Sequence, residues 1–219
     1  MSWSEYYQAT LDKPLHPIYG ELEPHLPSEG VALELGCGVG HGVRWFLDKG
    51  FSVIANDGDE EALQIVASRV GEHPRLTYLP GRFEEIDLPV ADVVVAGFSL
   101  FFLEPGAFRT FWIRLAASMK PGTLFAGQFL GVHDDWASRG YTVHDADSLS
   151  ADLTDFDVLH WEEAERDGET AMREPKHWHV FHIVARKRYV ALAPRGNTEL
   201  KDLLTKSLTF APPVASIEA

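Results

Sequence analysis

Short apolar runs and amphipathic stretches alternate along the chain from residue 31 onward. The runs at residues 31–33, 51–56 and 75–79 are bounded by Gly, Pro or an acidic residue, a pattern that predicts short strands. Over residues 59–70 the apolar side chains recur every three or four positions, which predicts a helix ending at Gly71. Strands that alternate with helices in this way predict an α/β fold built on a parallel sheet.

The middle of the chain continues the same order. Residues 91–97 are an almost uninterrupted apolar run, as expected for a central strand buried on both faces. A helix over 104–119 and a strand over 123–129 are predicted to follow. Residues 130–150 depart from both periodicities and are expected to form an irregular loop.

Two last strands, at 156–162 and 177–186, are expected to pair as a hairpin through a polar turn at residues 166–168. The two strands of a hairpin are antiparallel to each other, so one of them runs against the parallel strands, and the family resemblance given below implies that this is the last strand. We therefore expect that strand to begin at the edge of the sheet that carries the functional loops, with residues 176–179 near the site.

The two ends of the chain differ from this core. Residues 1–29 carry Trp3, Tyr6 and Tyr7 on one helical face, which suits either a helix lying on the domain surface or a lid over a bound ligand. Residues 189–219 are expected to hold a short amphipathic helix and a flexible tail. The predicted organisation is thus an N-terminal cap at 1–29, a main domain at 30–188 and a C-terminal appendage.

Glycines at positions 36, 38, 40 and 42 separate the first strand from the first helix of the main domain. Glycine tolerates a positive φ and lets a ligand approach the backbone, and the helix start behind the turn offers unpaired N–H groups. The stretch 31–42, VALELGCGVGHG, therefore predicts a cradle for a small molecule.

The glycine spacing distinguishes two classes of cofactor. A dinucleotide fingerprint, G-x-G-x-x-G, would need glycine at 41, where this chain has His41. The motif present is E-x-G-x-G-x-G with Glu34 two residues before Gly36. Asp57 follows 21 positions after Gly36, where the second strand ends beside the turn and a carboxylate can accept ribose hydroxyls.

These motifs resemble those of class I S-adenosylmethionine-dependent methyltransferases. The segments GFSLFF, FAGQFLG and PKHWHVFHIVARK are similar in pattern to small bacterial methyltransferases of the tellurite and thiopurine types. The resemblance implies a Rossmann-like three-layer sandwich, with a seven-stranded, mostly parallel sheet whose last strand is antiparallel. It also implies transfer of a methyl group from S-adenosylmethionine, which leaves as S-adenosylhomocysteine, to a small-molecule acceptor by in-line displacement.

The same resemblance assigns cofactor contacts to the loops after the first four strands: Glu34, Gly36, Cys37, Gly38, Gly40, Asp57, Gly58, Arg82, Phe83 and Phe98. One position departs from the family pattern, because Arg82 stands where many members have an aspartate that holds the adenine amino group. Arginine cannot accept a hydrogen bond from an amine. Adenine recognition then falls to the backbone of Arg82 and Phe83, or to stacking of the guanidinium on the ring.

Residues for the acceptor are harder to assign from sequence. The loops and the cap suggest a substrate-binding set of Tyr6, Tyr7, Phe101, Trp136 and His179. His133 and His177 are the candidate catalytic bases, with a solvated loop and a satisfied structural histidine as the alternatives. A base is required only if the acceptor loses a proton. His177 and His179 share a strand face, but no cysteine or H-x-x-E pattern completes a tetrahedral set, so we predict no metal.

Charge and composition restrict the partners. The formal net charge of −14, from 33 acidic and 19 basic residues, disfavours nucleic acid and anionic membrane surfaces. No apolar run is long enough to span a membrane and no targeting segment is recognisable at the N-terminus. The single cysteine, Cys37, predicts a reducing, cytoplasmic compartment. Monomer and homodimer both stay open, because an amphipathic helix after residue 189 must dock on its own domain or on a second copy.

Two rival functions share much of this pattern. A nicotinamide-dependent oxidoreductase has the same α/β architecture, and His41 together with the terminal hairpin argues against it. A non-catalytic protein that binds S-adenosylmethionine would keep the glycine turn and lack access for an acceptor.

Overall fold

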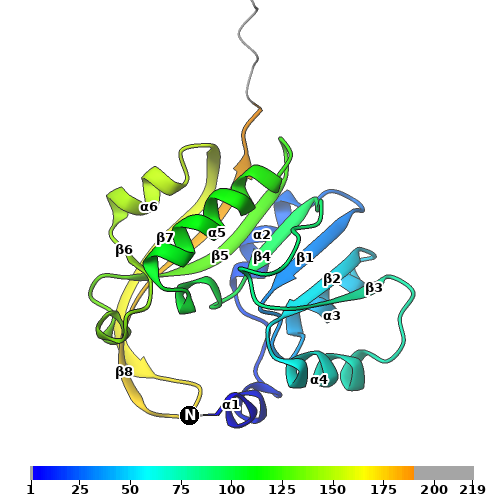
Figure 1. The fold of residues 1–219 in the computed structure, drawn as a ribbon, viewed down its shortest axis with the longest axis horizontal. Helices are drawn as coiled ribbons and strands as arrows, with labels where there is room; N and C mark the ends of the chain where they lie inside the picture. Colours follow the sequence, from blue (N-terminus) through cyan, green and yellow to red (C-terminus); the bar gives the residue numbers. More distant parts are fainter. Residues whose placement is uncertain (1, 190–219) are drawn as a thin grey trace, which may run out of the picture. The chain divides into compact units, whose positions relative to one another are not determined.

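The structure, a computed structural model, describes residues 2–189. The helix and tail predicted after residue 189 lie outside the described residues. Contacts divide the chain into Met1–Arg188 and Tyr189–Ala219, and the first of these units is the α/β domain drawn in colour in Figure 1. Within the described part of the chain, no helix combines the length and apolar character that crossing a membrane requires.

The domain is built on one sheet with the order β3-β2-β1-β4-β5-β8-β7. Its strands are β1 (Val31–Leu35), β2 (Ser52–Asp57), β3 (Leu76–Pro80), β4 (Val93–Ala96), β5 (Leu124–Gly131), β6 (Val143–His144), β7 (Phe156–Glu169) and β8 (Pro175–Lys187). The first five run parallel, whereas β8 is antiparallel to β5 and to β7. The predicted fold class is confirmed, with the two-residue β6 as an additional short strand on β5.

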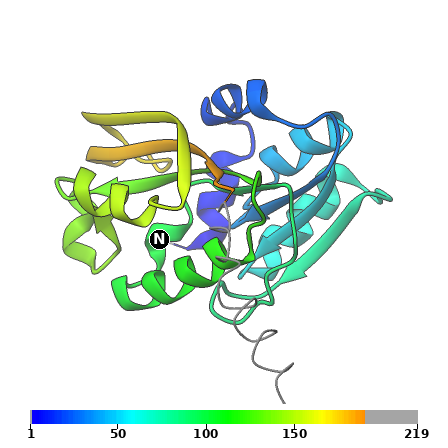
Figure 2. The ribbon, with the colours of Figure 1, turned by 90° about the horizontal axis from the view of Figure 1, so that it is seen from above.

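Helices cover both faces of the sheet, as Figure 2 shows from above. They are α1 (Trp3–Thr10), α2 (Ile18–Leu22), α3 (His41–Asp48), α4 (Glu60–Val70), α5 (Pro105–Ser118) and α6 (Ala146–Asp152), with short 3-10 turns at η1 (Glu23–His25), η2 (Leu100–Phe102) and η3 (Asp135–Arg139). Two apolar clusters fill the space between sheet and helices, one around α5 and one around α2 and α3. All four residues of β4 are buried, as the run at 91–97 predicted.

The region after β5 differs from the sequence prediction. Residues 130–150 are not an irregular loop throughout, because they contain η3, β6 and most of α6. Asp145 begins α6 by accepting a hydrogen bond from the Ser148 N–H, and the Ser148 hydroxyl bonds back to the Asp145 N–H. This capping box, with serine in place of glutamate, is a local sequence signal for the start of a helix.

The hairpin turn also lies elsewhere than predicted. Residues 166–168 belong to β7, since Arg166 pairs with Trp178 and Asp167 with His177 in the β7–β8 ladder. The chain turns instead after Glu169, where the Thr170 N–H donates to the Glu174 carbonyl at 2.8 Å. Polar residues on an exposed strand resemble a turn in sequence because one face of an antiparallel pair is open to water.

The N-terminal helix α1 and the residue after it contact the start of α3 and both ends of α4. The Tyr7 hydroxyl donates to Asp59 at 3.2 Å, and His41 Nε2 lies 2.9 Å from the Thr10 carbonyl oxygen. Arg69 Nη1 donates to the Leu11 carbonyl at 2.8 Å. These contacts bring α1 beside the glycine turn, because α3 begins directly after that turn.

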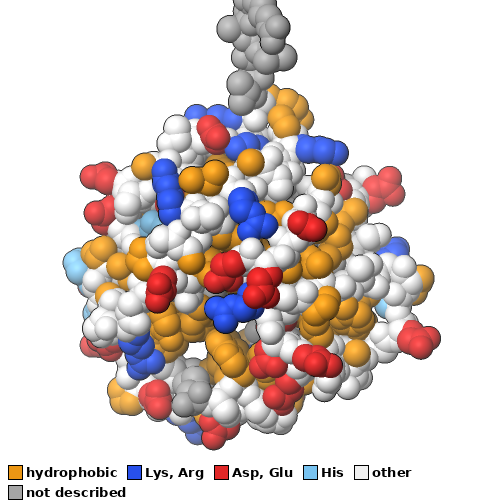
Figure 3. Space-filling view, in the orientation of Figure 1, with side chains coloured by type: hydrophobic (Ala, Val, Ile, Leu, Met, Phe, Trp, Pro, Cys, Tyr) orange, Lys and Arg blue, Asp and Glu red, His pale blue; other side chains and the backbone are white. Residues whose placement is uncertain are grey.

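Acidic side chains are spread over the face of the molecule shown in Figure 3.

Candidate functional site

The glycine turn after β1 has the backbone geometry that its sequence predicts. Gly36, Gly38 and Gly40 have φ values of 71°, 51° and 82°, which L residues rarely adopt. The N–H groups of Gly36 and Cys37 both donate to the Asn56 carbonyl, at 3.0 and 2.9 Å, and fix the turn to β2. The turn is therefore a rigid extension of the sheet.

The glycines differ in what surrounds them. A Cβ on Gly36 would lie 2.6 Å from Cβ of Ser99, whereas a Cβ on Gly38 would meet nothing within 4 Å. Gly36 is thus required for internal packing, while Gly38 faces open space. A ligand can approach the backbone at Gly38, so the turn fits the cradle expected for a cofactor.

Asp57 lies at the end of β2, beside this open position. Its Oδ2 accepts the Gly38 N–H at 2.9 Å and its Oδ1 accepts the Asp59 N–H at 3.0 Å. Burial raises the pKa of the Asp57 carboxyl, and the backbone N–H donors oppose that rise. Each oxygen keeps a further lone pair, so the carboxylate can still accept hydrogen bonds from a diol.

Glu34 has a different environment from the one the motif suggested. Its side chain is 4% exposed, and both carboxylate oxygens accept the Tyr19 hydroxyl at 3.0 Å. Burial raises the pKa of Glu34 to about 8. A Cβ on Gly42 would lie 2.1 Å from the Tyr19 hydroxyl oxygen, so the fourth glycine of the motif makes room for this pair. Glu34 supports the turn from the side of α2 and α3.

The loop after β3 contributes one side chain to the core and one to solvent. The Phe83 ring stacks on Phe111 with centroids 5.3 Å apart and approaches Gly36. Arg82 is exposed, and its guanidinium lies 3.6 Å from a Glu84 oxygen. Gly58 is exposed beside Arg82. Cys37 is partly buried, and burial raises the pKa of its thiol.

The cap helix spans from the glycine turn to the aromatic residues after β4. Tyr7 is buried against Val39, within the turn, and Ala62 of α4. At its other end, Trp3 contacts Phe102 with ring centroids 5.2 Å apart. A helix on the domain surface and a lid over a bound ligand are both consistent with these contacts.

An aromatic cluster lies next to the turn, where β4 ends. Its centre is Phe98, whose φ of 51° is unusual for a residue with a side chain. The Phe98 N–H donates to Gln128 Oε1 of β5 at 3.1 Å, which holds this strained backbone. Phe98 shares one packing cluster with the buried Phe101 ring and with four partly buried rings: Phe102, Trp136, Tyr141 and Trp178. The sequence predicted Phe98, Phe101 and Trp136 at the site, and the structure brings them together.

Two histidines also adjoin Phe98. The rings of His16 and His182 lie 5.4 and 6.3 Å from the Phe98 ring and stack on each other at 5.3 Å. Burial lowers the pKa of His16 to about 4 and lowers the pKa of His182. Both imidazoles are therefore neutral at pH 7.

The hydrogen bonds of His16 set its tautomer. Nδ1 accepts the Ile18 N–H at 3.1 Å and lies 3.3 Å from Gln128 Nε2. The ring proton is thus on Nε2. Sequence reasoning missed His16 and Gln128, which lie 112 residues apart. It could have found His182, because the two-residue period of β8 places that side chain with Trp178.

The three histidines proposed from sequence lie on another face. Along β8 the side chains of Trp178 and His182 face Phe98, so His177 and His179 point to the opposite side of the hairpin. His133 joins them there, with its ring 5.0 Å from that of His179. The expectation that residues 176–179 all adjoin the pocket is wrong, because a strand alternates its side chains.

Comparison with known proteins adds a family match over part of the chain and similarity in fold. Residues 32–122 match the family described as a methyltransferase domain, whereas no curated protein matches the chain. TehB from Haemophilus influenzae is similar in structure with a TM-score of 0.69 and 13% identity, covering 85% of this chain and 68% of that chain.

Two further methyltransferase structures resemble the chain. NodS from Bradyrhizobium japonicum WM9, an N-methyltransferase solved with S-adenosylhomocysteine, has a TM-score of 0.64 and 15% identity and covers 86% of this chain and 100% of that chain. The 1,6-didemethyltoxoflavin-N1-methyltransferase of Burkholderia thailandensis has a TM-score of 0.59 and 23% identity, with coverage of 80% and 78%. At these identities the likeness shows the fold.

Proposed function

We propose that this chain, which carries a methyltransferase domain with the class I fold and uses the S-adenosylmethionine of that family, methylates a small-molecule acceptor. The observation that carries the proposal is the pairing of an open glycine turn with a neighbouring aromatic cluster under one lid helix. Gly38 provides the approach for the donor, and the rings around Phe98 provide a wall for the acceptor.

The donor is held by residues at the ends of β1, β2 and β3. Gly38 permits close approach to the backbone, and Asp57 accepts hydrogen bonds from the ribose hydroxyls. The backbone of Arg82 and Phe83 is available for adenine. The Arg82 guanidinium points to Glu84, which makes stacking on adenine the weaker alternative. Glu34 acts through its bond to Tyr19 and positions the turn.

Bound S-adenosylmethionine supplies an electrophilic methyl group on a sulfonium. The protein's contribution is to hold the acceptor in line with that group and to exclude water. Phe98 and Trp178, which are partly buried, offer ring faces and edges, which suit a flat or apolar acceptor and a neighbouring positive charge. Tyr6 and Tyr7 close the site from α1.

We assign the proton-handling role to His182 instead of His133 or His177. His182 is neutral and half-buried, and its ring lies near Phe98, whereas the other two histidines point away from this cluster. A neutral imidazole can accept the proton of a phenol or alcohol as the oxygen attacks. His16 presents an Nε2–H donor and orients the acceptor.

Calorimetry with S-adenosylhomocysteine tests the donor. We expect binding at micromolar strength; no heat with this ligand, together with binding of a nicotinamide dinucleotide, would overturn the proposal in favour of an oxidoreductase. A labelled-methyl screen of phenols, thiols, amines, carboxylates and metalloid oxyanions then tests the reaction. Binding without transfer to any class would identify a non-catalytic binding protein.

A further inference from the structure

The hairpin presents a row of imidazoles and carboxylates on the face opposite Trp178 and His182. In the β7–β8 ladder Glu165 pairs with His179 and Asp167 with His177. Directly opposed residues of an antiparallel pair share a face, so these four side chains lie together. His177 Nδ1 is 2.7 Å from Asp167, and its Nε2 is 3.2 Å from Glu165.

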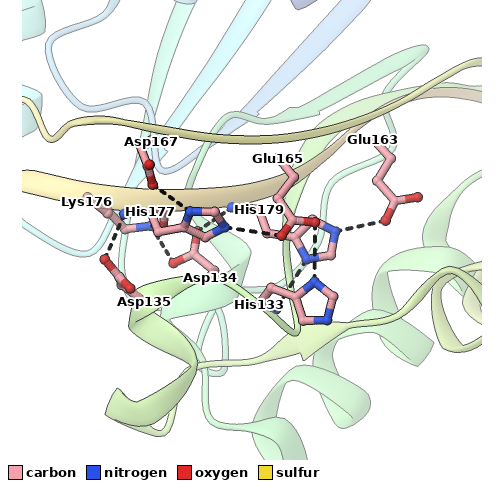
Figure 4. Close-up of polar contacts among 9 residues, drawn as sticks. All are labelled: His133, Asp134, Asp135, Glu163, Glu165, Asp167, Lys176, His177 and His179. Atoms are coloured by element: carbon pink, nitrogen blue, oxygen red, sulfur yellow. Dashed lines mark hydrogen bonds and ion pairs between the residues drawn. The ribbon is translucent and has the colours of Figure 1, made fainter.

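The segment after β5 adds a third histidine to this face. His133 Nδ1 lies 3.3 Å from the second oxygen of Glu165, so that Glu165 sits between His133 and His177 (Figure 4). The His133 side chain is 63% exposed, whereas His179 is buried at 2%. A solvent ion can reach the cluster from the His133 side.

His179 is held in an orientation suited to a ligand. Its Nε2 lies 2.9 Å from Glu163, and its Nδ1 accepts the His133 N–H at 3.2 Å. The Nε2 proton is thus directed at a carboxylate, the arrangement that commonly orients a metal-bound histidine. A Cβ on Gly131 would lie 2.1 Å from His179 Nδ1, so only glycine leaves room for this ring.

The charges on this face are unbalanced. The carboxylates of Glu163, Glu165 and Asp167 contact the three imidazoles, and Asp135 accepts the His177 backbone N–H. Lys176, the fixed cation among the residues of Figure 4, is buried in an ion pair with Asp134. A divalent cation would therefore reduce a local excess of negative charge.

We propose that His133, Glu165 and His179 form a binding site for a first-row transition metal ion of the Zn²⁺ type. One nitrogen of each imidazole and one carboxylate oxygen lie within 4.8 Å of one another. Bonds from Zn²⁺ to such atoms are about 2.0 to 2.2 Å, so a modest contraction brings all three onto one ion. The ion replaces the His133 N–H at His179 Nδ1, and His177 or water supplies the fourth ligand.

The donor set argues for a borderline metal. Two imidazoles and a carboxylate suit Zn²⁺, Co²⁺ or Ni²⁺, whereas Mg²⁺ and Ca²⁺ prefer oxygen ligands. Such an ion would fasten the segment after β5 to the hairpin. That segment carries Trp136, and the hairpin carries Trp178. The ring centroids of these two tryptophans lie 5.5 Å apart in the aromatic cluster. The proposed role is to hold this wall of the pocket.

The test uses the full chain without an affinity tag, freed of metal by a chelator. Titration calorimetry with Zn²⁺ should show one site per chain, and Co²⁺ should give the absorption of a nitrogen- and oxygen-bound ion. Mg²⁺ should give no heat. Absence of any Zn²⁺ site on the wild-type protein would overturn the proposal.

Variants localise the ion. His133→Ala and Glu165→Gln, both at exposed side chains, should each weaken Zn²⁺ binding at least about tenfold, by loss of a ligand, while circular dichroism stays unchanged. His160→Ala is the matched control, because His160 also lies between two glutamates, Glu21 and Glu162. Undiminished binding in the first two variants, or loss of binding in the control, would show that the ion binds elsewhere.

Discussion

The imidazoles of His16 and His182 stack with their centroids 5.3 Å apart and their planes at 19°. His16 lies just before α2 and His182 lies in β8. The pair therefore connects the N-terminal cap to the antiparallel strands of the sheet. Burial lowers the pKa of both rings, and a charge on His182 would further disfavour protonation of His16.

This pair predicts acid sensitivity. The pKa of His16 is about 4 in the folded chain against 6.5 when unfolded, so between these values the unfolded chain binds more protons. The free energy of unfolding should therefore fall as the pH is lowered from 6.5 to 4. His16→Gln should flatten this fall in urea titrations. A variant with the wild-type pH dependence would show that His16 is not the group responsible.

Glu34 predicts the opposite dependence at higher pH. Its folded pKa of about 8 lies above the ordinary 4.5, so raising the pH through this range favours the unfolded chain. Glu34→Gln should remove that loss, on the order of 3 to 5 kcal/mol between pH 5 and 9. Urea denaturation at both pH values measures it. Equal losses in the wild type and the variant would contradict the assignment.

Substitution of Gly38 is expected to weaken binding of S-adenosylhomocysteine, whereas a matched substitution of Gly140 lowers stability equally and leaves binding unchanged. Gly38→Ala should lower affinity for S-adenosylhomocysteine at least about tenfold, because a Cβ there projects into the open side of the turn. Gly140→Ala is the control, since Gly140 also has a positive φ and open surroundings. Both should lose about 1 kcal/mol of stability. Equal affinities in the two variants would remove Gly38 from the binding site.

Substitution of Asp57 is expected to remove charge-assisted hydrogen bonds to the bound ligand. Asp57→Asn keeps an oxygen for the Gly38 N–H and removes the charge, so binding of S-adenosylhomocysteine should weaken by about 1 to 3 kcal/mol. Calorimetry measures this change. Asp87→Asn, at an exposed residue outside the turn, should leave the affinity unchanged. A Kd that Asp57→Asn does not alter would place the ribose elsewhere.

His182 predicts an effect on rate. With a phenol or alcohol acceptor, His182→Gln should lower kcat by about 100-fold or more, and the rate should recover as the pH approaches the acceptor's own pKa. His177→Gln, on the other face of the hairpin, should retain the wild-type rate without added metal. A slow His177→Gln variant with a normal His182→Gln variant would restore the assignment made from sequence.

Local sequence patterns were sufficient for most of the fold. The glycine turn, the buried run of β4 and the end of β2 at Asp57 follow from periodicity and from residues with special backbone freedom. The errors arose where such signals conflict. Residues 166–168 are polar because one face of β7 is exposed, and α6 begins with a capping box within a segment expected to be irregular.

The sequence by itself determined the α/β class and the glycine turn, because these depend on short-range spacing, whereas the antiparallel last strand and the methyl donor were expectations from a family resemblance. Tertiary structure decided which side chains meet. His16 contacts Gln128, which is 112 positions away in the sequence, and His133 contacts Glu165, which is 32 positions away. The order of the strands in the sheet brings these residues together, and no local sequence pattern encodes that order. Tertiary structure also buried Glu34 beneath the turn, so a residue of the cofactor motif serves to support it.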